Sequence, residues 1–140
     1  MTKKEKTAQS NDLETKYLRA LADYQNLEKR VEREKDLFVK FANSILILKM
    51  LPILDNLERA QEHLKDQGIE LVVKQFNDAL ISEGVTSISD AGGEFNPELH
   101  EAVTHGTGEE GKVTEVLEKG YKLGEKVIRP AKVKVGQGDK

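Results

Sequence analysis

Two short segments contain residue types that could do chemistry. Gly106–Lys112, with the sequence Gly-Thr-Gly-Glu-Glu-Gly-Lys, matches GxGxxG and the first part of a phosphate-binding loop. Such loops bind phosphate through backbone N–H groups at the start of a helix. Here Val113 replaces the usual Ser or Thr, the residues that follow favour a strand, and Glu109 and Glu110 would repel phosphate. We therefore expect a loop or hairpin between strands instead of a nucleotide site.

The second segment, His100–His105, is close to the zinc-binding motif HExxH. Its two histidines are five residues apart, so they would not share one face of a helix, and no third ligand is evident. We expect surface or turn histidines and no metal site. No Ser-His-Asp set or carboxylate pair can be identified from the sequence, so ordinary surface charge is the simpler account of its polar residues.

The composition of the 140 residues argues against several classes of function. The 22 basic and 25 acidic residues are well mixed and give a net charge of −3, so we expect neither a nucleic-acid partner nor a membrane partner. The longest apolar run, Ile45–Leu48, is too short to span a bilayer, and the polar N-terminal residues do not resemble a secretory signal. The absence of cysteine fits a reducing compartment. We therefore expect a cytoplasmic protein.

The first element that could position a site is a long helix. Asn11 and Glu14 resemble a capping box, which predicts a dimerisation helix over residues 11–43 after a disordered tail of residues 1–10. Heptad core positions from Leu13 to Leu48 are apolar at ten of eleven places. Since this helix has no partner inside the chain, we predict a homodimeric coiled coil. The expected dimer-interface residues are Leu13, Tyr17, Ala20, Tyr24, Leu27, Val31, Phe38, Phe41, Ile45, Leu48, Leu51 and Leu54.

Residues 44–84 are expected to form two shorter helices of a dimeric four-helix bundle. The apolar stripe widens from Ile45 onward, as a helix with several neighbours requires, and Gly68 and Gly84 favour helix ends. Pro52 could lie in the first turn of a new helix or kink a continuing one.

Residues 85–140 are expected to form a small β-domain with a short C-terminal tail. Most of the glycines and several short β-branched runs lie there, which is typical of strands joined by turns. The fold class is therefore α+β. The runs that predict strands are Val85–Ser89, Val113–Leu117, Val127–Ile128 and Val133–Val135.

Five segments together resemble the GrpE family, in the right order and spacing, over roughly residues 15–135. They are Ala22–Arg30, Leu51–Ala60, Phe95–Val103, Gly120–Leu123 and Val127–Val135. The resemblance implies a homodimeric nucleotide exchange factor, a co-chaperone in protein folding and the stress response, whose partner is a DnaK-type chaperone. It also implies that the chain is not an enzyme and has no catalytic residue and no cofactor. One β-domain of the dimer would wedge into the chaperone's nucleotide-binding domain and hold its cleft open, so that ADP leaves and ATP enters.

The resemblance also implies which residues contact the chaperone. The implied contacts are Phe41 at the end of the long helix, Arg59 and Glu62 in the bundle, and Phe95, Pro97, Leu117 and Val135 in the β-domain. Two of them, Phe95 and Val135, could instead fill the core of the β-domain.

Two features of this sequence differ from the family pattern. The first is the N-terminal extension, which is commonly longer and acidic in the family. The second is the charge pattern of the long helix, because the family pairs its long helices in parallel. Parallel pairing here would oppose Asp23 to Glu28 and Arg30 to Lys35, which are like charges. A coiled-coil adaptor protein whose β-domain recognises another partner is the alternative function, and a nucleotide-binding protein using Gly106–Lys112 is a more distant one.

Overall fold

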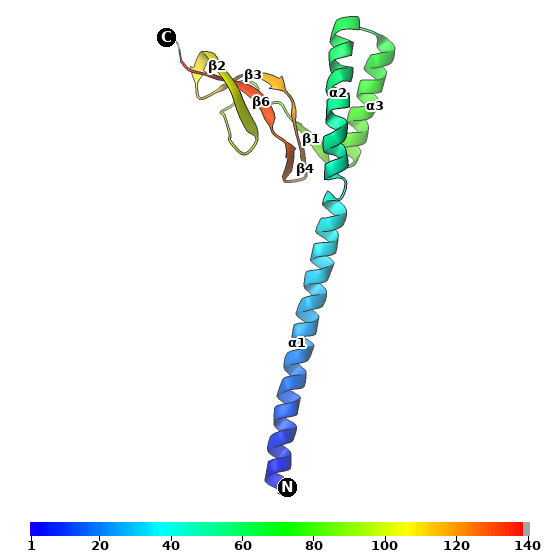
Figure 1. The fold of residues 1–140 in the computed structure, drawn as a ribbon, viewed down its shortest axis with the longest axis vertical. Helices are drawn as coiled ribbons and strands as arrows, with labels where there is room; N and C mark the ends of the chain where they lie inside the picture. Colours follow the sequence, from blue (N-terminus) through cyan, green and yellow to red (C-terminus); the bar gives the residue numbers. More distant parts are fainter. Residues whose placement is uncertain (139–140) are drawn as a thin grey trace. The chain divides into compact units, whose positions relative to one another are not determined.

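The computed structural model describes residues 1–138, and the chain divides into two compact units, the second beginning at Asn43. The first unit is essentially one helix, α1 (Lys3–Phe41; Figure 1). It begins at Lys3 and not at Asn11, because the Thr2 hydroxyl accepts from the Glu5 N–H and the Glu5 carboxylate accepts from the Thr2 N–H. Residues 3–10, which we expected to be a disordered tail, are thus helical.

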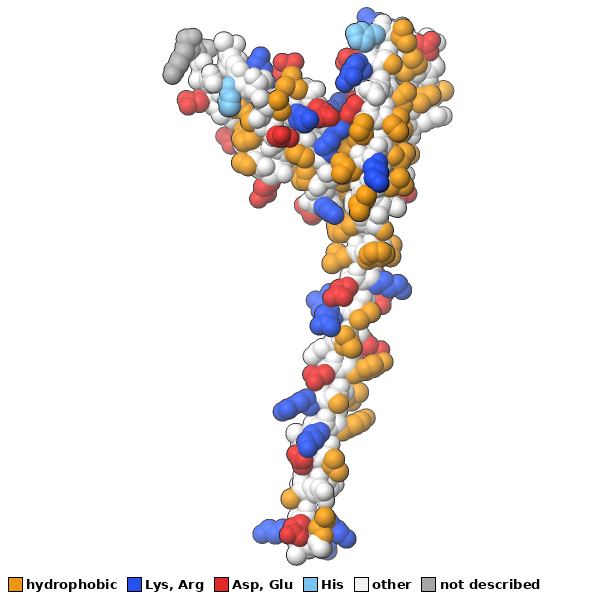
Figure 2. Space-filling view, viewed as in Figure 1, with side chains coloured by type: hydrophobic (Ala, Val, Ile, Leu, Met, Phe, Trp, Pro, Cys, Tyr) orange, Lys and Arg blue, Asp and Glu red, His pale blue; other side chains and the backbone are white. Residues whose placement is uncertain are grey.

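The helix α1 buries none of its side chains within the chain. Its apolar residues stay largely exposed, for example Tyr17 at 64%, Tyr24 at 59% and Phe38 at 74%, and Figure 2 shows hydrophobic side chains along the helix. Contiguous exposed apolar surface of this kind marks an interaction site. The stripe is therefore available for the self-association that the heptad pattern predicts.

The second unit opens with two helices, α2 (Ser44–Leu64) and α3 (Gln67–Ser82), which pack against each other. Pro52 lies inside α2 and not in a first turn. We expected α2 to stop at Gly68, but it ends earlier because Lys65 adopts a left-handed conformation and Asp66 caps the next helix. The Asp66 carboxylate accepts from the N–H groups of Gly68 and Ile69, so Gly68 belongs to the first turn of α3.

Two residues expected at the dimer interface, Leu51 and Leu54, are fully buried inside this unit. They face the other elements of their own chain, since α2 contacts both α3 and a strand of the β-domain. Ile45 and Leu48, on the same helix, are 68% and 43% exposed. The apolar stripe of α2 is therefore divided between the core of the unit and an open surface, and Leu51 and Leu54 belong to the core.

The β-domain contains two three-stranded sheets. The first has the order β1 (Val85–Ile88), β4 (Gly120–Leu123), β5 (Lys126–Arg129), and all its neighbours are antiparallel. The second has the order β2 (His100–Glu110), β6 (Ala131–Gly136), β3 (Val113–Glu118), with β2 parallel and β3 antiparallel to β6. The β-branched runs predicted β1, β3, β5 and β6. They did not predict β2 or β4, which contain glycine and few β-branched residues.

The β-domain core is small and apolar. Buried Ile88, Val113, Ala131, Val133 and Val135 form its centre. Partly buried Phe95, Leu99, Val116 and Val127 pack around them. Two glycines allow backbones to approach closely, because a Cβ at Gly120 would meet the backbone of residues 129–131 and one at Gly136 would meet the backbone of residues 108–109.

Candidate functional site

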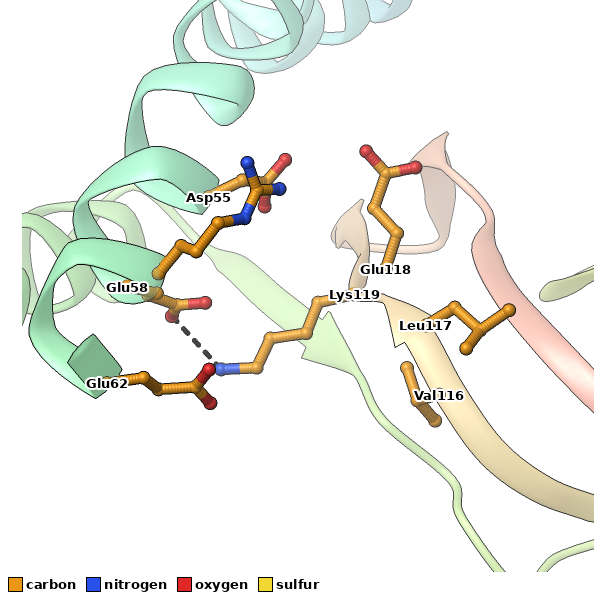
Figure 3. Close-up of a pocket in the computed structure, with 8 residues that line it drawn as sticks. Asp55, Glu58, Glu62, Val116, Leu117, Glu118 and Lys119 are labelled. Atoms are coloured by element: carbon orange, nitrogen blue, oxygen red, sulfur yellow. Dashed lines mark hydrogen bonds and ion pairs between the residues drawn. The ribbon is translucent and has the colours of Figure 1, made fainter.

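A cleft of about 280 Å³ lies between α2 and β3 (Figure 3). Its helical wall is built from residues three or four apart, which places them on one face of α2. Its other wall is the end of β3 and the turn into β4. The cleft brings together three residues that the family resemblance implied as contacts, Arg59, Glu62 and Leu117. All its lining residues are Asp55, Glu58, Arg59, Glu62, Val116, Leu117, Glu118 and Lys119.

An ion pair joins the two walls across the cleft. The Lys119 ammonium lies 3.0 Å from a Glu58 carboxylate oxygen. In Figure 3 the Lys119 side chain reaches from the β-domain toward the carboxylates of Glu58 and Glu62. Glu62 and Arg59 are exposed, and Arg59 donates a long hydrogen bond, 3.4 Å, to Asn56. Arg59 and Glu62 are thus accessible charged groups at the rim.

Leu117 is the prominent apolar group of the cleft. It is 49% exposed although it lies on a strand of the β-domain, while its neighbour Val116 packs against the core. Successive residues of a strand point to opposite faces, so Val116 directed inward leaves Leu117 directed outward. The site therefore combines one exposed leucine with a rim of charges, the composition of a protein contact surface.

A second charged group joins α2 to the β-domain beside the cleft. Arg129 donates to both carboxylate oxygens of Asp55, at 2.7 and 3.0 Å, and also contacts Glu118 at 3.2 Å. Burial disfavours the charged guanidinium, but the hydrogen bond and charge of Asp55 and the charge of Glu118 outweigh burial and raise the pKa of Arg129. Arg129 is therefore a fixed positive charge.

Tyr121 lies beneath this group. Its side chain is almost fully buried, and the Arg129 guanidinium carbon lies 5.5 Å from its ring centre. Burial, with smaller contributions from the negative charges of Glu58 and Asp55, raises the pKa of Tyr121 to about 12. The phenol is consequently neutral at physiological pH.

The other implied contact residues are not gathered at the cleft. Pro97 is exposed in the loop before β2, and Phe95 is half-buried against the β-domain core. Val135 is only 7% exposed and belongs to that core, so its side chain is not available at the surface. Phe41 ends α1, in the other unit, with the Lys40 ammonium 5.4 Å from its ring centre.

His100 is buried, contrary to the expectation of a surface or turn histidine. Its Nδ1 accepts from the Asn96 N–H at 3.0 Å, which leaves the proton on Nε2, 3.4 Å from an Asp90 carboxylate oxygen. The Phe95 ring lies 5.9 Å away. His105 is exposed, as expected. His100 therefore holds the loop that precedes β2 through its hydrogen bond to Asn96. The spacing of residues in the sequence does not predict this role.

The segment that resembles a phosphate-binding loop is mostly strand. Gly106–Glu110 ends β2, and Gly111 and Lys112 connect β2 to β3. The expected loop between strands is present, but it is not a hairpin, because β2 and β3 pair on opposite sides of β6. No helix N-terminus follows, and the Gly111 N–H already donates to the Gly136 carbonyl. The segment thus lacks the helix N-terminus at which such a loop binds phosphate.

Two further features concern metal binding and membrane spans. Within residues 1–138, no group of three or more His, Cys, Asp or Glu side chains could hold a metal ion. By length and composition alone, one helical stretch, Lys3–Leu64, contains an 18-residue window apolar enough to cross a membrane. Helices that bury an apolar face in a protein pass the same test, so this window is weak evidence for a membrane span.

Comparison with known proteins gives one consistent result. Residues 1–137 match the family model described as GrpE. A "Protein GrpE" from Parageobacillus thermoglucosidasius is 42% identical, covering 93% of this chain and 63% of the relative. Those from a Nitratiruptor species and from Clostridioides difficile are 39% and 40% identical, covering 91% and 89% of this chain and 81% and 65% of the relatives. The chain thus spans less than two thirds of the length of two of these three relatives.

Proposed function

The chain belongs to the GrpE family, and on that premise we propose that it is a cytoplasmic co-chaperone, a homodimeric nucleotide exchange factor for a DnaK-type chaperone. The observation that carries the proposal is the cleft between α2 and β3. There an exposed leucine, Leu117, and two accessible charges, Arg59 and Glu62, share one surface of the second unit.

The proposed dimer is supported by α1. A helix of 39 residues that buries no side chain in its own chain exposes far more apolar surface than a soluble monomer normally does. A second copy of α1 would cover the stripe through heptad packing. Ile45 and Leu48, exposed near the start of α2, are further apolar residues that a second copy would cover.

The proposed mechanism requires no catalytic residue. An exchange factor that binds the open, nucleotide-free form of the chaperone more tightly than the closed form shifts the population toward the open form. By thermodynamic linkage, the factor by which it weakens ADP binding equals the factor by which ADP weakens its own binding. The β-domain would supply the contact, with Leu117 as an apolar anchor and Arg59 and Glu62 as rim charges.

The proposal is tested by measuring release of a fluorescent ADP analogue from a DnaK-type chaperone in a stopped-flow instrument. The chain should accelerate release, and Leu117→Ala should weaken binding, because a buried apolar anchor contributes about 2 kcal/mol, roughly thirtyfold in affinity. Val103→Ala is the matched control, since Val103 is exposed on β2 to a similar extent, 54% against 49%. Arg59→Ala should cost less than Leu117→Ala, and its effect should shrink as salt rises.

The outcomes separate the alternatives. Equal release rates with Leu117→Ala and Val103→Ala would place the contact away from the cleft. Failure of the unmodified chain to accelerate release from any DnaK-type chaperone tested would contradict exchange activity and favour an adaptor whose β-domain recognises another partner.

A further inference from the structure

Within the second unit, charged side chains of two parts, α2 and the β-domain, meet where these parts approach each other. Figure 2 shows Lys, Arg, Asp and Glu side chains gathered in this hollow. Two side-chain pairs join the parts, Arg129 with Asp55 and Lys119 with Glu58. They differ in burial. Arg129 and Asp55 are only 12% and 17% exposed, whereas Lys119 is 46% exposed, so water and salt screen the Arg129 pair least.

The Arg129 guanidinium makes four hydrogen bonds and one further ion pair. Nη1 and Nη2 each donate to one Asp55 oxygen, Nε and Nη2 donate to the Lys119 carbonyl at 3.1 and 2.6 Å, and Nη1 also lies 3.2 Å from a Glu118 oxygen. A guanidinium presents five N–H donors in a planar fork, which lets one side chain reach these three residues together. A lysine ammonium could not reach the same acceptors together, because its three donors diverge from one atom.

The acceptors of Arg129 adjoin the residues of the cleft. Asp55 precedes Arg59 by one helical turn, and Glu118 and Lys119 directly follow Leu117. One side chain thus holds both walls, the helical wall through Asp55 and the strand wall through Glu118 and the Lys119 carbonyl. Beside this bridge the two walls are separated by the cleft and do not pack on each other.

We infer that Arg129 is a positioning residue, which fixes the β-domain against α2 and thereby assembles Arg59, Glu62 and Leu117 into one contact surface. Its functional consequence rests on the proposed exchange activity, while its structural consequence does not. Without the bridge, the β-domain stays attached through the connection from α3 to β1 and through the contacts of α2 with β5. It then samples several orientations, and only a fraction of the molecules present the assembled surface.

The structural consequence is measured in the free chain. The sequence contains no cysteine, so His63→Cys on α2 and Val103→Cys on β2 place two spin labels without side reactions. Labelled chain is mixed with excess unlabelled chain, so that each dimer holds at most one labelled copy. Electron paramagnetic resonance should give a narrow distance distribution for the parent and a broader one for Arg129→Lys and for Asp55→Asn. Glu109→Gln, which removes the Lys112–Glu109 pair inside the β-domain, is the control and should leave the distribution unchanged.

The functional consequence is measured with the same variants, without labels, in the ADP-release experiment. If the assembled orientation falls to about a tenth of the population, the chain concentration for half-maximal acceleration rises about tenfold. The maximal rate at saturation should stay near the parent value, since the chaperone selects the assembled fraction. A smaller folded fraction would raise the half-maximal concentration in the same way, so circular dichroism must first show that each variant is as fully folded as the parent.

The two hypotheses fail in different ways. An unchanged distance distribution in folded Arg129→Lys would overturn the positioning role, whatever the exchange activity. If Arg129→Lys does not fold, Asp55→Asn decides the same question, because Asp55 lies on α2, outside the β-domain. Broadened distances with a parent chain that accelerates no ADP release would support the positioning role and contradict the proposed function. Broadened distances with unchanged half-maximal concentration would overturn the functional consequence alone.

Discussion

The Tyr121 ring lies beneath the Arg129 guanidinium, and the buried Tyr121 hydroxyl has no hydrogen-bond partner among the described residues. A phenol in this position is held neutral by burial and by the carboxylates of Glu58 and Asp55. The ring and the guanidinium lie together at the junction between α2 and the β-domain. The protonation state of the Tyr121 phenol therefore reports on whether that junction is intact.

The first prediction concerns pH. The pKa of Tyr121 is about 12 in the folded chain against 10.0 for an unperturbed phenol. Between these values the unfolded chain has lost a proton that the folded chain retains, so the unfolding free energy contributed by Tyr121 falls as pH rises. Ultraviolet titration should show one tyrosinate step near pH 12 that is absent in Tyr121→Phe. The unfolding free energy of the parent should fall relative to that of Tyr121→Phe across the same range, and a constant difference would contradict the assignment.

The second prediction concerns Gly120. A Cβ at this position would meet the backbone of Arg129, Pro130 and Ala131, which cannot rotate away as a side chain can. Gly120→Ala should therefore lower the unfolding free energy by about 1–3 kcal/mol, the usual cost of overpacking. Gly93→Ala is the control, because its Cβ would be 3.4 Å from the nearest atom. Urea denaturation midpoints check both, and similar midpoints would show that the strands can shift apart at Gly120.

The third prediction concerns His100. His100→Leu fills the buried position with an apolar side chain but leaves the Asn96 N–H without its acceptor. The substitution should lower the unfolding free energy by about 1–3 kcal/mol. His105→Leu, at an exposed position five residues along β2, should change stability by no more than about 0.5 kcal/mol. Denaturation of the two variants side by side provides the measurement. Equal stability would mean that the hydrogen bond to Asn96 contributes nothing.

The fourth prediction concerns assembly through α1. Leu27 and Val31 are 45% and 52% exposed in the single chain and occupy core positions of the heptad pattern. Replacing both with Asp should dissociate the dimer, because an unpaired carboxylate in an apolar seam is strongly unfavourable. The strand content should persist, since the β-domain has its own core. Sedimentation and circular dichroism check the two statements, with Gln25→Asp, outside the apolar seam, as the control.

The fifth prediction concerns the direction of pairing. In a parallel dimer the same heptad position faces its own copy across the two-fold axis, so Leu13→Cys should form an intermolecular disulfide under oxidation. In an antiparallel dimer the two copies lie at opposite ends of the rod and cannot react within one dimer. An intact dimer that does not crosslink would agree with the like charges at Asp23 and Glu28 and contradict the family's parallel arrangement.

Strong periodic or local signals made the elements predictable. The heptad positions predicted the long helix, and β-branched runs predicted four of the six strands, because helix and strand periods depend on neighbouring residues. Element ends were less predictable. The start of α1 at Lys3 depends on a capping box of Thr2 and Glu5, whose sequence pattern resembles that of Asn11 and Glu14. The strand β2 was missed because its glycines and polar residues carry no strand periodicity of their own.

The sequence by itself determined the α+β class, the apolar stripe of α1 and the family, since these depend on the order and spacing of residues along the chain. Only the tertiary structure decided that Val135, Leu51 and Leu54 are core residues, that His100 is buried, and that Arg59, Glu62 and Leu117 line one cleft. The contact of Arg129 with Asp55, 74 residues away along the chain, is likewise seen only in the tertiary structure. Contacts over such separations depend on how helices and strands pack, and an exposed and a buried valine have the same sequence signature.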